Sequence, residues 1–293
     1  MKSNDTYERI TQTIVEQLEK GVKPWISPWN GAPNMKLPLR ANGQTYQGIN
    51  VLALWIASLT FGYDQPMWMT FKQAQELGGQ VRKGEKSTLV VKYGTFTPKD
   101  EMPVDNEERQ IPYLKGYSVF NIRQIDGLPD HLFIQPDLPD NEIEPHVIAD
   151  TFIANTGAKI EFSGTQAFYR PSADTITMPD RKRFVDQTHL YSTLLHELGH
   201  WTAAKSRLDR DLSGRFGNEA YAMEELVAEL TSAFVCSDLQ VPINPEENTA
   251  TYISTWLEVL KNDPKAIFTA ASKAQAAANY LHSLQPSELD KAA

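Results

Sequence analysis

Residues 196–200 read His-Glu-Leu-Gly-His, and this pattern constrains the chain more than any other feature of its sequence. Residues four apart lie on one face of an α-helix, so the imidazoles of His196 and His200 can reach the same metal ion. Glu197 stands next to the first histidine, where its carboxylate can act as a general base on a metal-bound water. Leucines at helical spacing predict that residues 186–201 form this helix. The pattern therefore predicts a metal site of the kind found in zinc hydrolases.

A second, carboxylate-rich helix is predicted over residues 219–234, with Asn218 as its N-cap. Glu225 and Glu229 border its apolar stripe, where a carboxylate is costly unless it is paired or binds a metal. A catalytic zinc takes three protein ligands and leaves its fourth position to water. We assign the third ligand to Glu225, and we expect Glu229 to hold a ligand imidazole in one tautomer. The two roles can be exchanged, Glu224 is a further candidate, and the simpler alternative is an amphipathic helix with solvated glutamates.

The expected ion is Zn2+, with Mn2+ or another divalent metal as the alternative. Hydrolysis of a peptide also needs a strand that holds the substrate, and we expect residues 175–178 to form an edge strand suited to this. It further needs a donor to the developing oxyanion, for which Tyr191, Tyr221 and Arg215 are candidates that the sequence does not separate. The sequence leaves open whether the site is catalytic.

Charge separates the two halves of the chain. The formal net charge is −9, of which residues 1–130 carry +1 and residues 131–293 carry −10, while the window 20–95 carries +6. Residues 129–145 are rich in proline and acidic side chains and show no clear apolar period, which is typical of a linker. We therefore expect one domain over residues 1–128, a linker over 129–145 and a second domain over 146–293.

The hydrophobic pattern predicts an α+β fold. In the first half it predicts helices at 5–20, 49–59 and 71–77 and strands near 80–93 and 115–122. In the second half it predicts strands at 158–162 and 175–178, and helices at 146–156, 249–261 and 264–283 beside the two helices described above.

The sequence also indicates a compartment. Its first residues lack the apolar core of a secretory signal, and the longest apolar stretch, residues 49–61, is too short to span a bilayer. Cys236 is the only cysteine, so no disulfide can form within the chain, and its apolar neighbours indicate a buried side chain. We expect a cytoplasmic protein without a membrane segment.

Aromatic and basic side chains alternate within the basic window, as they do on surfaces that bind single-stranded nucleic acid. Flat rings stack on unpaired bases, and cations follow the phosphates. The residues that we expect to contact nucleic acid are Lys23, Trp25, Trp29, Arg40, Tyr46, Arg82, Lys83 and Lys86. The two tryptophans among them lie between prolines, which favours an exposed loop. A solvated basic surface would have the same composition.

Several segments, taken together, resemble ArdC antirestriction proteins. The first half resembles their N-terminal domain, which also occurs in some plasmid primases, in the segments Lys23-Pro-Trp-Ile-Ser-Pro-Trp, Tyr46-Gln-Gly-Ile-Asn-Val-Leu-Ala-Leu-Trp, Trp68-Met-Thr-Phe-Lys-Gln-Ala and Gly79-Gln-Val-Arg-Lys-Gly-Glu-Lys. The second half resembles the metallopeptidase-like domain that accompanies it, in Phe168-Tyr-Arg-Pro-Ser-Ala-Asp-Thr-Ile-Thr-Met-Pro, His196-Glu-Leu-Gly-His-Trp-Thr and Glu224-Glu-Leu-Val-Ala-Glu-Leu.

The resemblance implies an α+β domain that binds single-stranded DNA, followed by a zincin-like metallopeptidase domain with a small sheet and an HExxH helix. It implies that the protein protects incoming conjugative plasmid DNA from host restriction endonucleases, and a host restriction enzyme is then a candidate protein substrate. The metal residues carry over as His196, His200 and a glutamate of the 225–229 pair, with Glu197 as the base.

Two other functions remain compatible with the sequence. One is a cytoplasmic zinc protease whose first domain binds protein, and the other is a DNA-binding or DNA-mimicking protein whose metal site is not catalytic. Salt-dependent binding of single strands would separate the first alternative from an antirestriction protein, because phosphate contacts weaken with salt. A Glu197→Gln substitution would test the second alternative, because a protein whose metal site is not catalytic would still protect DNA without this base.

Overall fold

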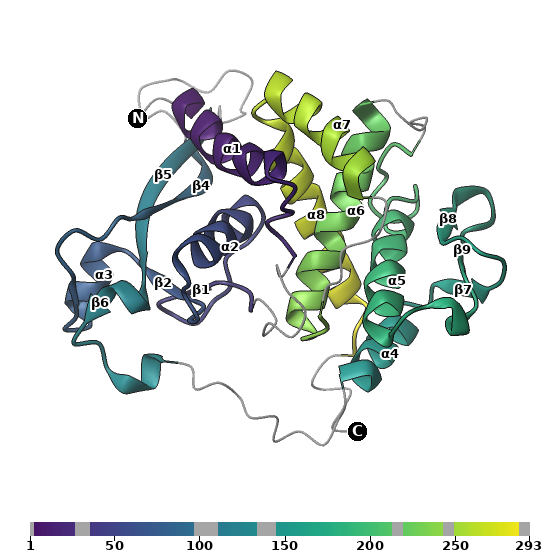
Figure 1. Ribbon diagram of the computed structural model, residues 1–293, viewed down its shortest axis with the longest axis horizontal. Coiled ribbons are helices and arrows are strands. Elements are labelled where there is room, and N and C mark those ends of the chain that lie inside the picture. Colours follow the sequence, from purple (N-terminus) through teal and green to yellow (C-terminus); the bar gives the residue numbers. More distant parts are fainter. Residues whose placement is uncertain are drawn as a thin grey trace, which may run out of the picture. The chain divides into compact units, whose positions relative to one another are not determined.

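The computed structural model describes residues 3–26, 36–96, 111–133, 145–212, 219–242 and 249–286, which form helices and strands in both halves of the chain (Figure 1). The chain divides into two compact units: Met1–Ile14 with Pro38–Ile134, and Val15–Leu37 with Gln135–Ala293. The α+β fold expected from the sequence is confirmed. The division differs from the expected domains, because residues 15–37 belong with the second unit and the boundary falls at residue 134.

The first unit is built on a sheet of order β1-β2-β5-β4. Its elements are the start of α1 (Ser3–Glu19), β1 (Leu39–Arg40), α2 (Ile49–Phe61), β2 (Met67–Met69), α3 (Phe71–Glu76), β3 (Gln80–Val81), β4 (Thr88–Phe96), β5 (Ile111–Asn121) and β6 (Ile125–Asp126). Strands β4 and β5 form an antiparallel ribbon that pairs Thr88 with Val119 at one end and Phe96 with Ile111 at the other. Figure 1 shows this ribbon as the longest strand pair of the unit.

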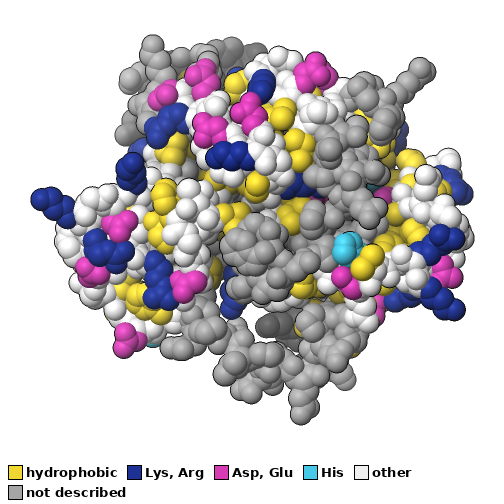
Figure 2. Space-filling model, viewed as in Figure 1, with side chains coloured by type: hydrophobic (Ala, Val, Ile, Leu, Met, Phe, Trp, Pro, Cys, Tyr) yellow, Lys and Arg dark blue, Asp and Glu magenta, His cyan; other side chains and the backbone are white. Residues whose placement is uncertain are grey.

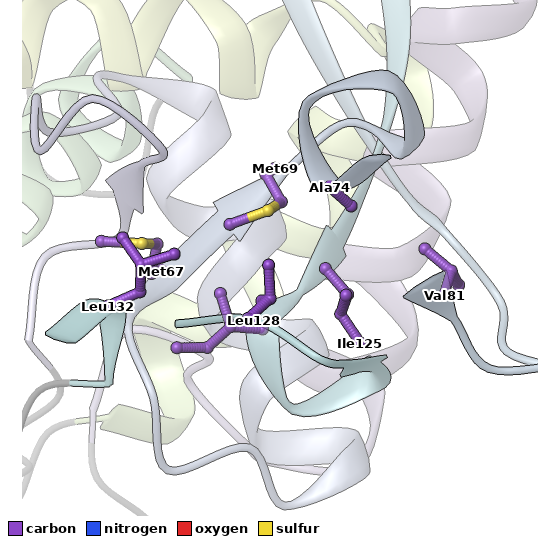
Figure 3. Close-up of a cluster of buried hydrophobic side chains, with 8 residues drawn as sticks. Met67, Met69, Ala74, Val81, Ile125, Leu128 and Leu132 are labelled. Atoms are coloured by element: carbon purple, nitrogen blue, oxygen red, sulfur yellow. The ribbon is translucent and has the colours of Figure 1, made fainter. Parts of the chain in front are cut away.

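A compact cluster of apolar side chains lies under one end of this sheet (Figure 3). Met67 and Met69 from β2 meet Ala74 from α3 and the side chains of Ile125 and Leu128. Leu132 completes the cluster and is 9% exposed, although residues 129–145 were expected to be a linker. Leu132 and Phe133 therefore add apolar side chains to the core of the first unit, at the start of the stretch for which the sequence predicts a linker.

Local signals in the sequence explain where the elements of the first unit begin and end. Thr70 caps α3 by accepting a hydrogen bond from the Gln73 amide, and the Gln73 side chain accepts one from the Thr70 amide. Gly62 ends α2 in the left-handed conformation, which glycine adopts without strain. Asn50, near the start of α2, exchanges hydrogen bonds of 2.8 and 2.7 Å with the backbone of Val91 and so satisfies part of the outer edge of β4.

The second unit combines a small sheet with five helices among its described residues. They are α4 (Pro145–Asn155), β7 (Lys159–Phe162), β8 (Phe168–Arg170), β9 (Thr175–Met178), α5 (Gln187–Trp201), α6 (Glu219–Asp238), α7 (Thr249–Asn262) and α8 (Ala266–Ser283). Helix α6 packs against both α5 and α8 (Figure 1). The last residues of α1 also belong here, since Glu19 forms a 2.7 Å ion pair with Lys261 of α7.

One expectation for this unit is wrong. Strand β9 is the central strand of the order β7-β9-β8, not an edge strand, and all four of its residues are buried. Helix α8 lies within its predicted range, and Asp263 accepts a hydrogen bond from the Lys265 amide in the turn before it. Asn218 lies outside the described residues. Cys236 is buried as predicted, and within the described part of the chain no helix is long and apolar enough to cross a membrane.

Candidate metal centre

The candidate metal centre depends on a close approach of two helices. Asp186 starts α5 by accepting a hydrogen bond from the His189 amide, which places the His-Glu-Leu-Gly-His segment in the last turns of that helix. Gly199 faces α6 there, and a Cβ atom on it would lie 3.0 Å from the Cα atom of Ala228. Only glycine allows this separation without a shift of the helices, so Gly199 brings the α5 histidines within reach of the α6 glutamates.

His196, His200 and Glu225 come together between the two helices, with their ligand atoms within 4.8 Å of one another. The two Nε2 atoms are 3.2 Å apart. Glu225 presents one oxygen to each ring, at 3.4 Å from Nε2 of His196 and 3.5 Å from Nε2 of His200. Ligands about 2.0–2.1 Å from a tetrahedral zinc ion are about 3.3 Å apart, so these separations fit a single divalent cation. Two imidazoles and one carboxylate are also a donor set that such ions prefer.

Burial and hydrogen bonding act in opposite directions on these groups. Burial favours the neutral form of the Glu225 carboxyl, but its contacts with His196 and His200 outweigh this effect and hold its pKa well below the usual range. Burial lowers the pKa of His200, but contacts with Glu224 and Glu225 outweigh it and raise this pKa to about 9. The site therefore concentrates negative charge opposite the two rings, as a cation site requires.

Glu224 contacts the outer nitrogen of His200 and is itself held by an arginine. Its Oε1 atom is 3.3 Å from Nδ1 of His200, and Arg210 donates to both of its oxygens, at 2.7 and 3.1 Å. Arg210 also donates to the Gly199 carbonyl and the Thr202 hydroxyl, and its side chain is only 5% exposed. This arrangement orients His200, and nothing in the spacing of the sequence indicates that Arg210 takes part.

Glu229 occupies the equivalent place for His196. Its Oε2 atom lies 3.6 Å from Nδ1 of His196, and its Oε1 atom accepts hydrogen bonds from Lys23 at 2.7 Å and from the Trp25 indole at 3.3 Å. The Trp25 ring packs edge-on against Trp256, with ring centroids 5.8 Å apart. Burial raises the pKa of Glu229, but contacts with His196 and Lys23 lower it to about 2, so a largely buried carboxylate anion lies between Lys23 and the His196 imidazole.

Glu197 is 6% exposed and lines a cleft of about 770 Å³ together with both histidines and Glu225. Strand β8 contributes Phe168 and Tyr169 to the same cleft, and its free side is the sheet edge nearest to the metal residues. Of the three candidate oxyanion donors, Tyr221 lines the cleft, Tyr191 is buried away from its lining, and Arg215 lies outside the described residues.

Comparison with known proteins gives the family. Residues 4–120 match the N-terminal domain of anti-restriction factor ArdC, and residues 147–273 match a zincin-like metallopeptidase domain. The metal-free crystal structure of the antirestriction ArdC protein from plasmid R388 is 43% identical, with a TM-score of 0.81 over 95% of this chain and 97% of that one. The chain belongs to the ArdC antirestriction family. The Mn(II)-bound structure of the R388 protein is similar as well, with 42% identity and a TM-score of 0.79 over the same shares of the two chains.

Other relatives of this ArdC family member differ in length. The uncharacterized protein y4eC of Sinorhizobium fredii is 43% identical over 96% of this chain and 92% of its own length. The DNA primase TraC of Escherichia coli is 37% identical over 97% of this chain, but the match covers only 20% of the primase. The similarity to TraC therefore concerns one fifth of that protein.

The structure changes the list of expected DNA contacts. Lys23 is 6% exposed and Trp25 is fully buried, and both side chains donate to Glu229, so neither lies on the surface as the predicted contact with nucleic acid would require. Trp29 lies outside the described residues. The Tyr46 ring is also buried, beneath the exposed guanidinium of Arg40.

The remaining candidates lie in the turn between β3 and β4. The Arg82 guanidinium donates hydrogen bonds to Glu85, Asp126 and the Arg123 carbonyl, whereas Lys83 and Lys86 are exposed. On the face drawn in Figure 2, basic side chains around α3 and β6 alternate with acidic ones. Charge alone therefore does not mark a DNA-binding surface on this face.

Replacement of Glu225 by Ala should weaken binding of Zn2+ or Mn2+ by at least about 100-fold, because one of three ligands is removed. Isothermal titration with each metal measures this. Glu219→Ala, at an exposed position in the first turn of the same helix, is the matched control and should bind normally. Equal affinities of the two variants would contradict the assignment.

Replacement of Lys23 by Met should weaken metal binding roughly 10-fold, since Glu229 loses the cation that holds it against His196. Breaking a buried ion pair also destabilises the fold. Trp25→Phe, which removes only the indole donor, should therefore show a smaller loss of the same kind, while the exposed Lys20→Met should show none. A lower unfolding temperature with unchanged metal affinity in the first two variants would assign the contact a purely structural role.

Proposed function

We propose that this protein binds single-stranded DNA through its first unit and carries a metal-dependent peptidase site in its second unit. Together the two activities protect incoming conjugative plasmid DNA from host restriction endonucleases in the cytoplasm, and a host restriction enzyme is the candidate protein substrate. The observation that carries the proposal is the convergence of His196, His200 and Glu225 beside Glu197 in one cleft. Membership of the ArdC family supports it.

We propose Zn2+ as the native ion and Mn2+ as the alternative, which the Mn(II)-bound structure of the R388 protein supports. His196, His200 and Glu225 would hold it, and it would supply a Lewis acid that polarises a carbonyl and lowers the pKa of water. The two buried carboxylates behind the rings, Glu224 and Glu229, keep both Nε2 atoms turned toward this point.

The protein groups around the cleft account for the rest of the proposed reaction. Glu197 lies on α5 between the two ligand histidines, so its buried carboxylate can take a proton from the attacking water and deliver it to the leaving amine. The free backbone edge of β8 can pair with an extended peptide and hold it along the cleft. Tyr221 lines this cleft, so its hydroxyl can donate a hydrogen bond to the oxyanion.

Replacement of Glu197 by Gln tests whether hydrolysis is the mechanism. The variant should bind metal like the wild type but lose roughly 100- to 10,000-fold in peptide hydrolysis, because it lacks the proton acceptor. Conjugative transfer of an unmodified plasmid into a restricting recipient should fall to the level seen without the protein. Glu219→Gln is the control. Full protection by Glu197→Gln would overturn the hydrolytic mechanism and leave the DNA-binding account with a non-catalytic metal site.

Binding of a labelled oligothymidylate, followed by fluorescence anisotropy over a range of salt concentrations, tests the other half of the proposal. The logarithm of the association constant should fall with the logarithm of salt concentration, with a slope of roughly −0.7 for each phosphate contacted. A flat profile, or no binding at low salt, would favour a protein-binding role for the first unit.

A further inference from the structure

The β4–β5 ribbon of the first unit has one face on which tyrosines and lysines gather. Side chains of cross-strand partners point to the same face, so Lys92 and Lys115 share a face with Tyr113, which is paired with Gly94, and with Tyr117, which is paired with Val90. We propose that this face, carrying Tyr113, Tyr117, Lys92 and Lys115, is where single-stranded DNA binds. The inference rests on the proposed DNA-binding function and gives it a site.

The two tyrosine rings lie half-buried against the ribbon. A Cβ atom on Gly94 would come within 2.6 Å of the Tyr113 ring, so the absence of a side chain at residue 94 allows that ring to lie on the backbone. The Lys115 ammonium lies 5.3 Å from the centre of the Tyr117 ring. Both rings are partly accessible to solvent. A ring that is already seated loses little freedom when a base stacks on it, which favours binding.

Charge on this face favours a polyanion. Lys92 and Lys115 are directly opposite each other in the register, both are exposed, and like charges in this position repel. Among the residues that the structure describes, neither ammonium has a carboxylate within ion-pair distance. The paired strands place no acidic residue on this face. A phosphate between the two lysines would replace their repulsion with two attractions.

The opposite face of the ribbon is partly covered. Helix α1 lies against it, since a Cβ atom on Gly116 would be 3.8 Å from the Thr6 hydroxyl, and the hydroxyls of Tyr7 and Tyr93 are 3.2 Å apart. At the end of the proposed face where Thr88 pairs with Val119, Val90 and Val119 are buried. The accessible part therefore begins beside Tyr117 and extends toward Tyr113.

The spacing of the rings favours single strands over duplex. Tyr113 and Tyr117 are four residues apart in β5, which corresponds to about 13 Å along a strand. Bases in a duplex follow one another every ~3.4 Å and have both faces covered by their neighbours, so they cannot meet two rings at this distance. An extended single strand with unstacked bases can.

Anisotropy titrations of the full chain with a labelled oligothymidylate test the site. Tyr113→Leu and Tyr117→Leu should each weaken binding roughly 5- to 100-fold and leave the salt slope unchanged, because stacking carries no charge. Lys92→Gln and Lys115→Gln should each reduce the salt slope by about 0.7. Gly94→Ala should also weaken binding, although it removes no ring and no charge, because it displaces Tyr113.

Matched controls lie in the same unit. Tyr93→Leu removes an exposed tyrosine from the opposite face of the same ribbon, and Lys72→Gln removes a lysine of α3 that is 85% exposed. Both should bind DNA like the wild type. Circular dichroism and an unfolding curve for each variant show whether the ribbon remains folded, and Gly94→Ala and the lysine variants serve if a tyrosine variant unfolds.

The outcomes separate the two proposals. If the wild type binds no single-stranded DNA, the proposed function fails. If the wild type binds and the folded ribbon variants bind equally well, the DNA-binding function stands and this site is wrong. Losses of the same size in Tyr93→Leu and Lys72→Gln would likewise overturn the site, because the effect would then not belong to this face.

Discussion

The contact between Gly199 and Ala228 is the constraint on which the second unit depends. Without a side chain at residue 199, α5 and α6 approach closely enough for histidines on one helix and a glutamate on the other to share a point. Each ligand imidazole is then backed by a buried carboxylate, and each of those by a buried cation, Arg210 or Lys23. The charges alternate outward from the centre, which is how a low-dielectric interior tolerates so many ionised groups.

Local spacing in the sequence predicts that these histidines and glutamates face one another, and in the structure they lie close together. Two histidines four apart on a helix, and glutamates beside an apolar stripe, define which side chains face inward. Contacts between segments that are distant in the sequence could not be predicted in this way. Lys23 is over two hundred residues from Glu229, and its basic, aromatic surroundings indicated an exposed loop, whereas the carboxylate it meets lies in the core.

The same limit applies to the sheets. The sequence predicts strands at 158–162 and 175–178 but not β8, whose three residues are too few to show a period. Burial of all four β9 side chains marks a central strand, but a short apolar run has the same composition in either place. In the first unit, the sequence predicts the basic window and a strand in each half of the ribbon, but not which side chains of the two strands lie side by side, because that depends on strand register.

Lys23 and Trp25 lie within the segment that matches the N-terminal family domain, yet their side chains donate to Glu229 beside the candidate metal centre of the zincin-like unit. The bounds of the matched family domain therefore do not coincide with the bounds of the structural units. A change at Lys23 therefore acts on a glutamate of a helix far along the chain, and the two positions constrain each other's substitution.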